Sequence, residues 1–213
     1  MKSAPSVSIP DLLESTLVSH GYRKFDKRHW RQQLSPRIIT GITVSELARG
    51  GAESHDAEVI CSLSDLVIDR IRFLKPDVKL PKFPFPSFTQ KLTSSFPDGE
   101  LWNPSYPRGG DGRPILARFA ALLDVHVLPF FKRHSTPETA LGLFLEPGGA
   151  AAFEVEVSSS IAKEGLSKVE TLVRKCSKQY GVTASHRDSF FARIRTMTDQ
   201  DLSAIVAPFR KAD

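Results

Sequence analysis

The sequence predicts an α+β fold: an antiparallel sheet of four to five strands packed against helices, with a helical C-terminal extension. Three observations lead to this prediction. Apolar residues alternate with polar ones in the first half of the chain, as in strands with one buried face. A long amphipathic segment follows at 114–131. Beyond residue 146 the apolar stripes recur mostly at helical spacing.

The first element expected is a helix from about residue 9 to residue 20. Pro10 suits the first helical turn, where its missing N–H is not needed. Asp11 and Glu14 lie near the positive end of the helix dipole, and Gly21 suits the residue after a helix end.

Strand-like runs come next. Ser35 and Pro36 form a turn signal between a charged run that starts near Tyr22 and an apolar run that starts at Arg37, so we expect an antiparallel hairpin. The segment that starts at Ser64 fits either a helix capped by Ser64 or a continued strand, and we favour the helix. Further strand-like runs lie at 57–63, 88–96 and 99–104.

The central helix at 114–131 has one apolar face, made by Leu116, Phe119, Ala120, Leu123, Val127 and Phe130. Pro129 has no N–H and its ring clashes with the carbonyl of Val125, so we expect a kink or an end near Leu128. Ser135 or Thr136 is expected to cap a short helix that has Pro137 at its first position.

The remaining chain is expected to be helical, although 153–161 also fits a strand. A strong helix is predicted over 166–180, ending at Gly181, and another around 190–197. Thr198 and Asp201 have the spacing of a helix cap, which predicts a last helix. We therefore expect an α+β domain at 1–145 and a helical C-terminal extension at 146–213 packed on it.

The composition fits a soluble cytoplasmic protein. The 213 residues are 40% hydrophobic and 25% charged, with a net charge of +5. The N-terminus lacks the apolar core of a secretion signal, and no stretch reads as the roughly 20 apolar residues that span a bilayer. Cys61 and Cys176 lie in apolar segments, which favours buried free thiols in a reducing compartment.

The most distinctive local feature is a basic cluster between His20 and Arg37. Its six cations face a single acid, Asp26, so its net charge of +5 equals that of the whole chain; they are Arg23, Lys24, Lys27, Arg28, Arg31 and Arg37. On one extended strand, Arg28 and Trp30 share a face, a pairing that grips phosphate and stacks a base. Three interpretations stay open: a charged edge strand with Trp30 in the core, an acidic protein partner, or nucleic acid.

A second candidate surface is the proline-rich loop that carries Phe83, Phe85 and Phe88. If these rings are exposed together, they form an apolar patch that marks a binding site. The alternative is a loop that closes one end of the core.

Motifs of catalysis are not found. The six histidines show no ligand spacing with one another, and no Cys or carboxylate clusters with them. The glycine pairs match no phosphate-binding loop, and no serine lies in a nucleophile elbow. We therefore predict no catalytic residue, no metal site and no cofactor.

Part of the chain resembles a known family. The segments HGYRKFDKRHWRQQ, GELWNPSY and DVHVLPFFKRHSTPETAL follow the order seen in the bacterial domain-of-unknown-function family 4304, over about residues 9–145. The chain departs from the family at Asn103, where a second Trp often follows the first, and in a longer proline-rich loop at 76–88. The resemblance implies a small antiparallel sheet with helices on one face, and no activity.

Taken together, we expect a non-catalytic cytoplasmic protein that binds another macromolecule. The favoured partner is an acidic protein, and a toxin-neutralising (immunity-type) protein is one concrete version. The expected contacts are Arg23, Lys24, Lys27, Arg28, Trp30 and Arg31 of a basic hairpin, with Phe83 and Phe85. A nucleic-acid-binding accessory protein is the first alternative, and an enzyme with a dispersed site is the second. No membrane partner is expected.

Overall fold

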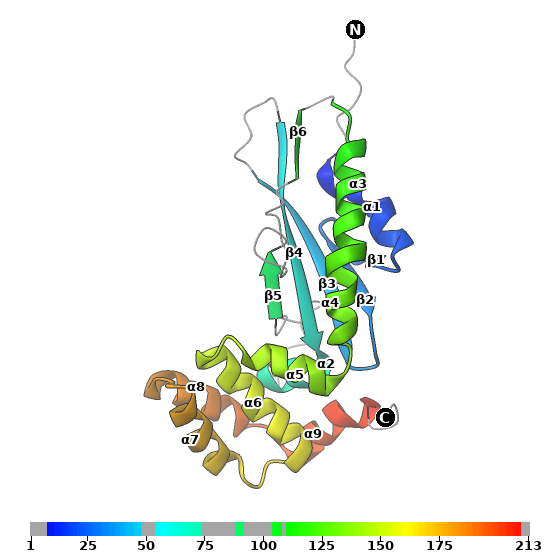
Figure 1. Cartoon of the computed structure of the whole chain (residues 1–213). Helices are drawn as coiled ribbons and strands as arrows, with labels where there is room; N and C mark the ends of the chain where they lie inside the picture. The colour runs from blue at the N-terminus through cyan, green and yellow to red at the C-terminus, as the bar shows by residue number, and fades with distance from the viewer. Residues whose placement is uncertain (1–7, 48–53, 74–87, 92–103, 108–109, 210–213) are drawn as a thin grey trace. The chain divides into compact units, whose positions relative to one another are not determined.

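A computed structural model describes residues 8–47, 54–73, 88–91, 104–107 and 110–209 (Figure 1), and its fold is α+β, as predicted. The chain divides into two compact units. The first unit comprises residues 1–33, 40–62 and 89–133, and the second comprises residues 34–39, 63–88 and 134–213.

Within the part of the chain that the structure describes, six strands make one sheet in the order β1-β2-β3-β4-β5, with β6 paired to β4. Their bounds are β1 Arg23–Lys24, β2 His29–Gln33, β3 Ile38–Leu47, β4 Ser54–Asp65, β5 Phe88–Lys91 and β6 Ser105–Pro107. Within the described residues, the charged run that starts near Tyr22 folds into two strands instead of one. In addition, Ser105–Pro107 pairs with Ser54–Asp56, outside the strand-like runs that the sequence predicts.

The two longest strands follow the alternation that the sequence predicts. In β3, Ile38, Ile42 and Val44 are fully buried, and in β4 the buried apolar residues are Ala57, Val59, Cys61 and Leu63. The strands approach closely at Gly41, where an added Cβ would lie 2.7 Å from Ser62 Oγ. A side chain at residue 41 would therefore force Ser62 to move.

Helix α1, Ile9–Ser19, lies beside the third helix and contacts β1. The Ser8 hydroxyl accepts a hydrogen bond from the Asp11 N–H at 3.3 Å, which caps the helix. Its buried face is made by Ile9, Pro10, Leu13 and Leu17. At its C-terminal end, His20 Nε2 lies 3.1 Å from Asp124 Oδ1.

Of the two outcomes expected near Leu128, a kink or an end, the end does not occur. The helix continues from α3, Arg113–Leu122, through a π-helical segment, η1 Leu123–Val127, into α4, Leu128–Arg133. In η1 the Leu128 N–H bonds to the Leu123 carbonyl, five residues back. A wider turn just before Pro129 gives the proline ring room without ending the helix. The buried residues are Phe119, Leu123, Val127 and Phe131.

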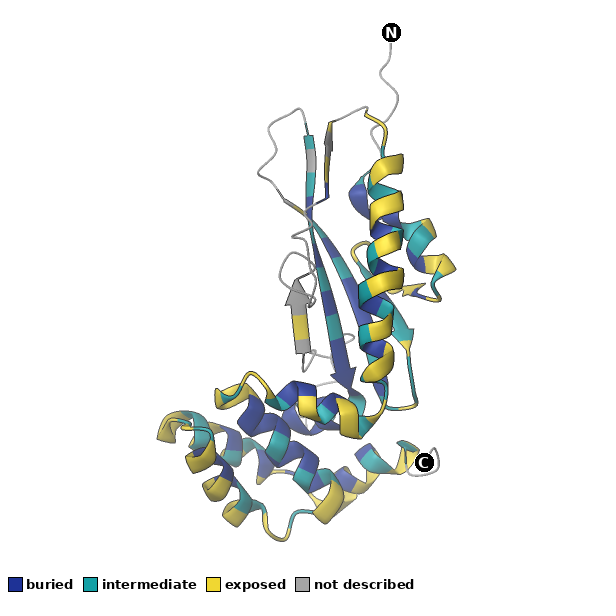
Figure 2. Ribbon diagram, viewed as in Figure 1, coloured by how far each residue is buried: buried dark blue, intermediate teal, exposed yellow. Residues whose placement is uncertain are grey.

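The whole of Arg113–Arg133 is long and apolar enough to cross a membrane, judged by length and composition only. The expectation that no stretch of the chain has this length and apolar character is therefore corrected for 113–133. Only 22% of its most apolar window is buried, and Figure 2 shows the exposed outer face. Arg118 and Asp124 lie on that exposed side.

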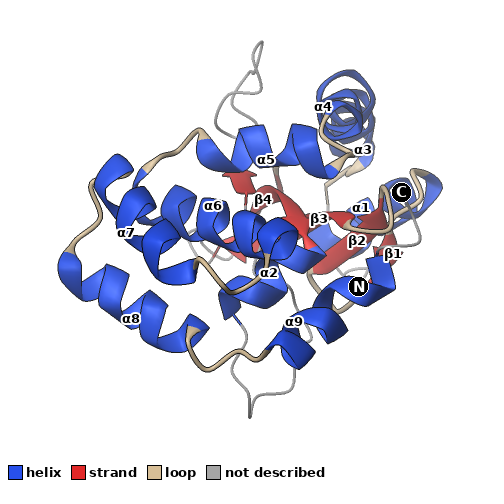
Figure 3. Ribbon diagram, turned by 90° about the horizontal axis from the view of Figure 1, so that it is seen from below, coloured by secondary structure: helices blue, strands red, loops and turns tan. Residues whose placement is uncertain are grey.

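The second unit is a helical bundle around one apolar core (Figure 3). Its helices are α2 Leu66–Phe73, α5 Pro137–Leu145, α6 Gly149–Glu164, α7 Val169–Gln179, α8 Ala184–Ile194, α9 Asp199–Val206 and the short η2 Ala207–Phe209. The ambiguous segment 153–161 is helical. Because α2 and α5 group with the C-terminal helices, the second unit does not begin at the expected boundary after residue 145.

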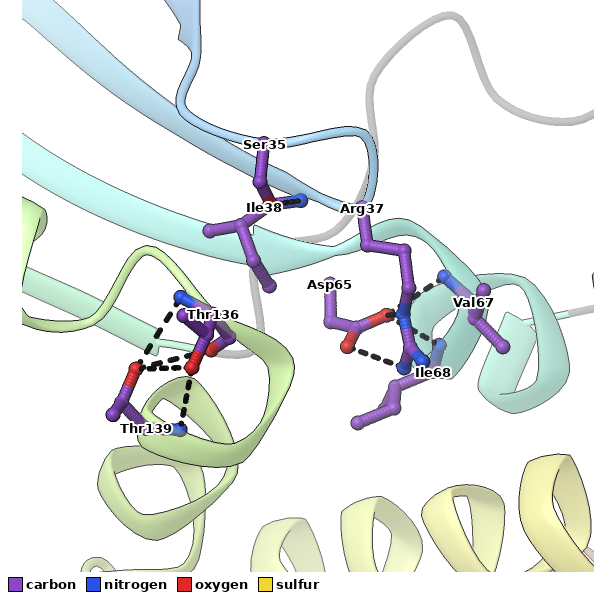
Figure 4. Close-up of polar contacts among 8 residues, drawn as sticks. All are labelled: Ser35, Arg37, Ile38, Asp65, Val67, Ile68, Thr136 and Thr139. Carbon is purple, nitrogen blue, oxygen red and sulfur yellow. Dashed lines mark hydrogen bonds and ion pairs between the residues drawn. The ribbon is translucent and has the colours of Figure 1, made fainter. Parts of the chain in front are cut away.

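Side-chain caps fix where these helices begin. The α2 cap is Asp65 and not Ser64, since Asp65 Oδ1 accepts hydrogen bonds from the Val67 and Ile68 N–H groups at 2.9 and 3.2 Å (Figure 4). Thr136 and Thr139 form a reciprocal cap for α5. Thr198 and Asp201 do the same for α9, as the sequence predicts.

Candidate functional site

The basic cluster folds into a tight hairpin. Arg23 pairs with Arg31 and Lys24 with Trp30 across β1 and β2. The turn between the strands is closed by the Phe25 N–H, which donates to the His29 carbonyl at 2.8 Å. Residues 25–28 are therefore a turn, and the single extended strand expected for this run is wrong.

Asp26 holds the turn together. Its Oδ1 accepts a hydrogen bond from the Arg28 N–H at 2.8 Å and from the His29 ring at 2.6 Å. Partial desolvation alone would raise the pKa of Asp26, but these hydrogen bonds and the nearby imidazole outweigh it and hold the pKa below its usual value. The one acid of the cluster is thus engaged within the turn, as an Asx turn requires.

The turn directs the cations outward. Arg23, Lys24, Lys27 and Arg28 are all exposed. Lys24 forms an ion pair with Glu14 of α1. Within the described part of the chain, the side chains of Arg23, Lys27 and Arg28 form no ion pair.

An aromatic residue lies between these charges. The Phe25 side chain is 42% exposed, and the Arg31 guanidinium carbon lies 3.7 Å from its ring centroid. Desolvation by partial burial lowers the pKa of Arg31, while Asp26 opposes this effect. Arg23 and Arg31 are direct cross-strand partners, and like charges in that position destabilise a hairpin. An anion bound between them would remove this repulsion.

Trp30 is not part of the exposed surface. It is fully buried, and its indole Nε1 has no hydrogen-bond partner among the described residues. Lys24 Nζ lies 5.7 Å from its ring centroid. Arg28 belongs to the turn and is exposed, whereas Trp30 belongs to β2 and is buried. The two side chains therefore do not share a face, and the expected pair that grips phosphate and stacks a base does not form.

Arg37, the last cation of the cluster, has a structural role. Its Nη2 donates to Asp65 Oδ2 at 2.7 Å and its Nε to Oδ1 at 3.3 Å (Figure 4). Asp65 is fully buried and also caps α2. Arg37 therefore neutralises a buried carboxylate and is not available to a partner.

The second candidate surface cannot be placed, since Phe83 and Phe85 lie outside the described residues, as does the side chain of Phe88. Among the residues that are described, no group of three or more His, Cys, Asp and Glu side chains is arranged to hold a metal. Cys61 and Cys176 are buried free thiols, as predicted.

One charged cluster was missed by the sequence analysis. Glu154 of α6 lies in the core of the second unit, where Arg72, His186 and Arg193 surround it at 3.4, 3.1 and 3.5 Å. His186 Nε2 lies within ion-pair distance, but its geometry is not that of a hydrogen bond. The seven-residue spacing of His186 and Arg193, two helical turns, is the only sequence signal that places these two on one face.

Comparisons with family models, curated proteins and solved structures give no match for this chain. The resemblance to family 4304 therefore stays a prediction.

Proposed function

We propose that this chain is a non-catalytic cytoplasmic protein that binds an acidic surface of another protein through its β1–β2 hairpin. The observation that carries the proposal is the exposed tip. Lys27 and Arg28 project there without an ion pair to any described residue, next to the half-exposed ring of Phe25.

The chemistry of the hairpin favours a protein over nucleic acid. Binding energy at protein interfaces concentrates in a few aromatic and Arg residues, and Phe25 stacked on Arg31 is such a pair. Stacking of unpaired bases needs an accessible aromatic platform. Trp30 is fully buried, and Phe25 has the Arg31 guanidinium against its ring. An acidic partner would also relieve the repulsion between Arg23 and Arg31.

The test reverses the two charges at the tip with Lys27→Glu and Arg28→Glu. Tagged wild-type and variant proteins are used to capture partners from host lysate treated with nuclease, at low and moderate salt. We expect a stoichiometric acidic protein on the wild type that is lost from the variant, since rim charges control the rate of association. Complex formation is then measured with the purified partner by calorimetry.

The matched control reverses Lys163 and Lys168, which are exposed lysines of the second unit. If the purified partner binds the Lys27→Glu, Arg28→Glu variant as tightly as wild type, the hairpin is not the binding surface. If nothing is retained after nuclease treatment at either salt concentration, the acidic-protein proposal is wrong.

A further inference from the structure

Outside the hairpin region, acidic and basic residues are equal in number, but the basic residues gather in a second segment. Residues 168–195 carry seven basic residues against two acidic ones, a net charge of +5, equal to that of the hairpin region. The rest of the chain must then sum to −5, because the total is +5. This second segment is the helix pair α7–α8 and the residues next to it.

The two helices are joined by a short connection of the kind found in helix-turn-helix motifs. Four residues, 180–183, join α7 to α8, and Gly181 has a φ of +62°, which favours glycine. The Val182 N–H closes the turn by donating to the Ser177 carbonyl at 2.9 Å. Thr183 then caps α8 by accepting from the His186 N–H. A short turn that contains Gly is typical of DNA-binding helix pairs.

Helix α6 supports the pair and fixes the rotation of α8. Phe153 of α6 packs edge-on against the rings of His186 and Phe190, with centroids 6.2 and 5.2 Å apart. Glu154 holds His186 and Arg193 on the same side. The inner face of α8 is therefore defined, and the opposite face is free for a ligand.

That opposite face carries small side chains. The exposed residues of α8 are Ala184, Ser185, Asp188, Ser189 and Ala192. Asp188 is engaged by the Arg187 guanidinium at 2.7 Å, which also holds the pKa of this carboxyl below its usual value. A helix of 11 residues is about 16 Å long, and with short side chains it fits a major groove about 12 Å wide.

Exposed cations occur on α7 and directly after α8. Lys175 and Lys178 of α7 are exposed and form no ion pair within the described residues, and Arg195 follows α8 directly. A hollow of about 400 Å³ between α7 and α8 is lined by Arg174, Lys178 and Arg187, among others. A helix inserted in a groove with cations at its sides has the arrangement needed to contact phosphates on both strands.

We propose that α8 enters the major groove of B-form duplex DNA, with Lys175, Lys178 and Arg195 on the flanking phosphates. The proposal does not depend on the hairpin, since it uses no residue of the first unit. Duplex DNA is chosen over RNA because the major groove of A-form RNA is too deep and narrow for a helix.

The test measures fluorescence anisotropy of a labelled duplex of about 20 base pairs, roughly two helical turns, between about 50 and 200 mM salt. The full-length wild type is expected to bind with a Kd of about 1–100 μM. Lys175→Ala with Lys178→Ala is expected to weaken binding and reduce the salt slope by about 2, one for each phosphate contact.

A charge-matched pair tests the groove contact itself. Ala192→Glu places a carboxylate on the outer face and is expected to lower affinity at least about ten-fold, whereas Ala192→Lys should retain or increase it. Both substitutions suit an exposed helix position, and circular dichroism confirms folding. The control Lys163→Ala should bind as wild type does.

Three outcomes would overturn the proposal: no binding by the wild type at the lowest salt, equal affinity of the two Ala192 variants, or binding of duplex RNA as tightly as duplex DNA.

Discussion

At the scale of single residues, the hairpin depends on Asp26. Asp26 is the one acid in the basic cluster of the sequence. Its carboxylate closes the turn by accepting from the Arg28 N–H, and it also accepts a hydrogen bond from the His29 ring. Because these contacts engage the Asp26 carboxylate, it does not compete with an acidic partner for the Lys27 and Arg28 side chains.

The lowered pKa of Asp26 predicts a pH dependence. Its contribution to stability is fully present above the unfolded-state pKa of about 3.9 and is lost as pH falls through the lower folded-state pKa. Asp26→Asn should therefore unfold at lower urea concentration than wild type at pH 7, and the difference should vanish in strong acid. A carboxyl titration of Asp26 by NMR with a midpoint at or above that of a model peptide would contradict this prediction.

The buried thiols give a second prediction at this scale. Burial raises the pKa of Cys61 to about 12 and also raises that of Cys176. Since the thiolate is the reactive form, neither residue should react with a disulfide reagent at neutral pH in the folded protein. The unfolded protein, which should titrate two thiols, is the control. Rapid native reaction of either thiol would show that its surroundings open readily.

At the scale of elements, the pairing of β3 with β4 depends on a missing side chain. Gly41→Ala would bring its Cβ to 2.7 Å from Ser62 Oγ, which also donates to the Gly41 carbonyl. We expect a loss of about 1–3 kcal/mol, as for other overpacked sites.

Ser62→Ala removes the oxygen that causes the clash, so the double variant should recover most of that loss. Urea unfolding of the two single variants and the double variant completes a double-mutant cycle. A double variant that shows no rescue would mean that backbone crowding, and not Ser62, excludes a side chain at residue 41.

The ion-pair cluster around Glu154 gives the second prediction at the element scale. Glu154 joins α2 and α8 to α6 through Arg72, Arg193 and His186, and its side chain is 12% exposed. Glu154→Ala leaves the two guanidinium groups without it, and we expect a loss of about 3–5 kcal/mol in urea unfolding. The exposed Glu146→Ala is the control and should cost less than about 0.5 kcal/mol. A loss below about 1 kcal/mol for Glu154→Ala would show that the cluster does not stabilise the fold.

At the scale of the whole molecule, the two proposed surfaces belong to different compact units. A crossed experiment with the Lys27→Glu, Arg28→Glu variant and the Ala192→Glu variant therefore separates them. The first should lose the acidic protein and keep DNA binding, and the second should do the reverse. All these positions are exposed, so the melting temperatures should stay near that of wild type. If each variant loses both ligands, the assignment of the acidic protein to the hairpin and of DNA to α8 is wrong.

Local patterns were enough to predict most of the elements. Helix caps such as Thr198 with Asp201 depend on residues three positions apart, and the buried alternation of β3 depends on neighbours two positions apart. The central helix was predicted over 114–131, but its π-helical turn was not, because the way a proline is accommodated depends on the packing of both halves of the helix.

The sequence by itself determined the α+β class, the buried free cysteines and the basic character of residues 20–37, since these depend on composition and short-range spacing. Only the tertiary structure decided that Trp30 is buried and that the Arg37 guanidinium pairs with Asp65. The physical reason is the range of the interactions: burial and ion pairing join residues far apart in the chain, such as Arg72 and Glu154, and no local pattern encodes those partners.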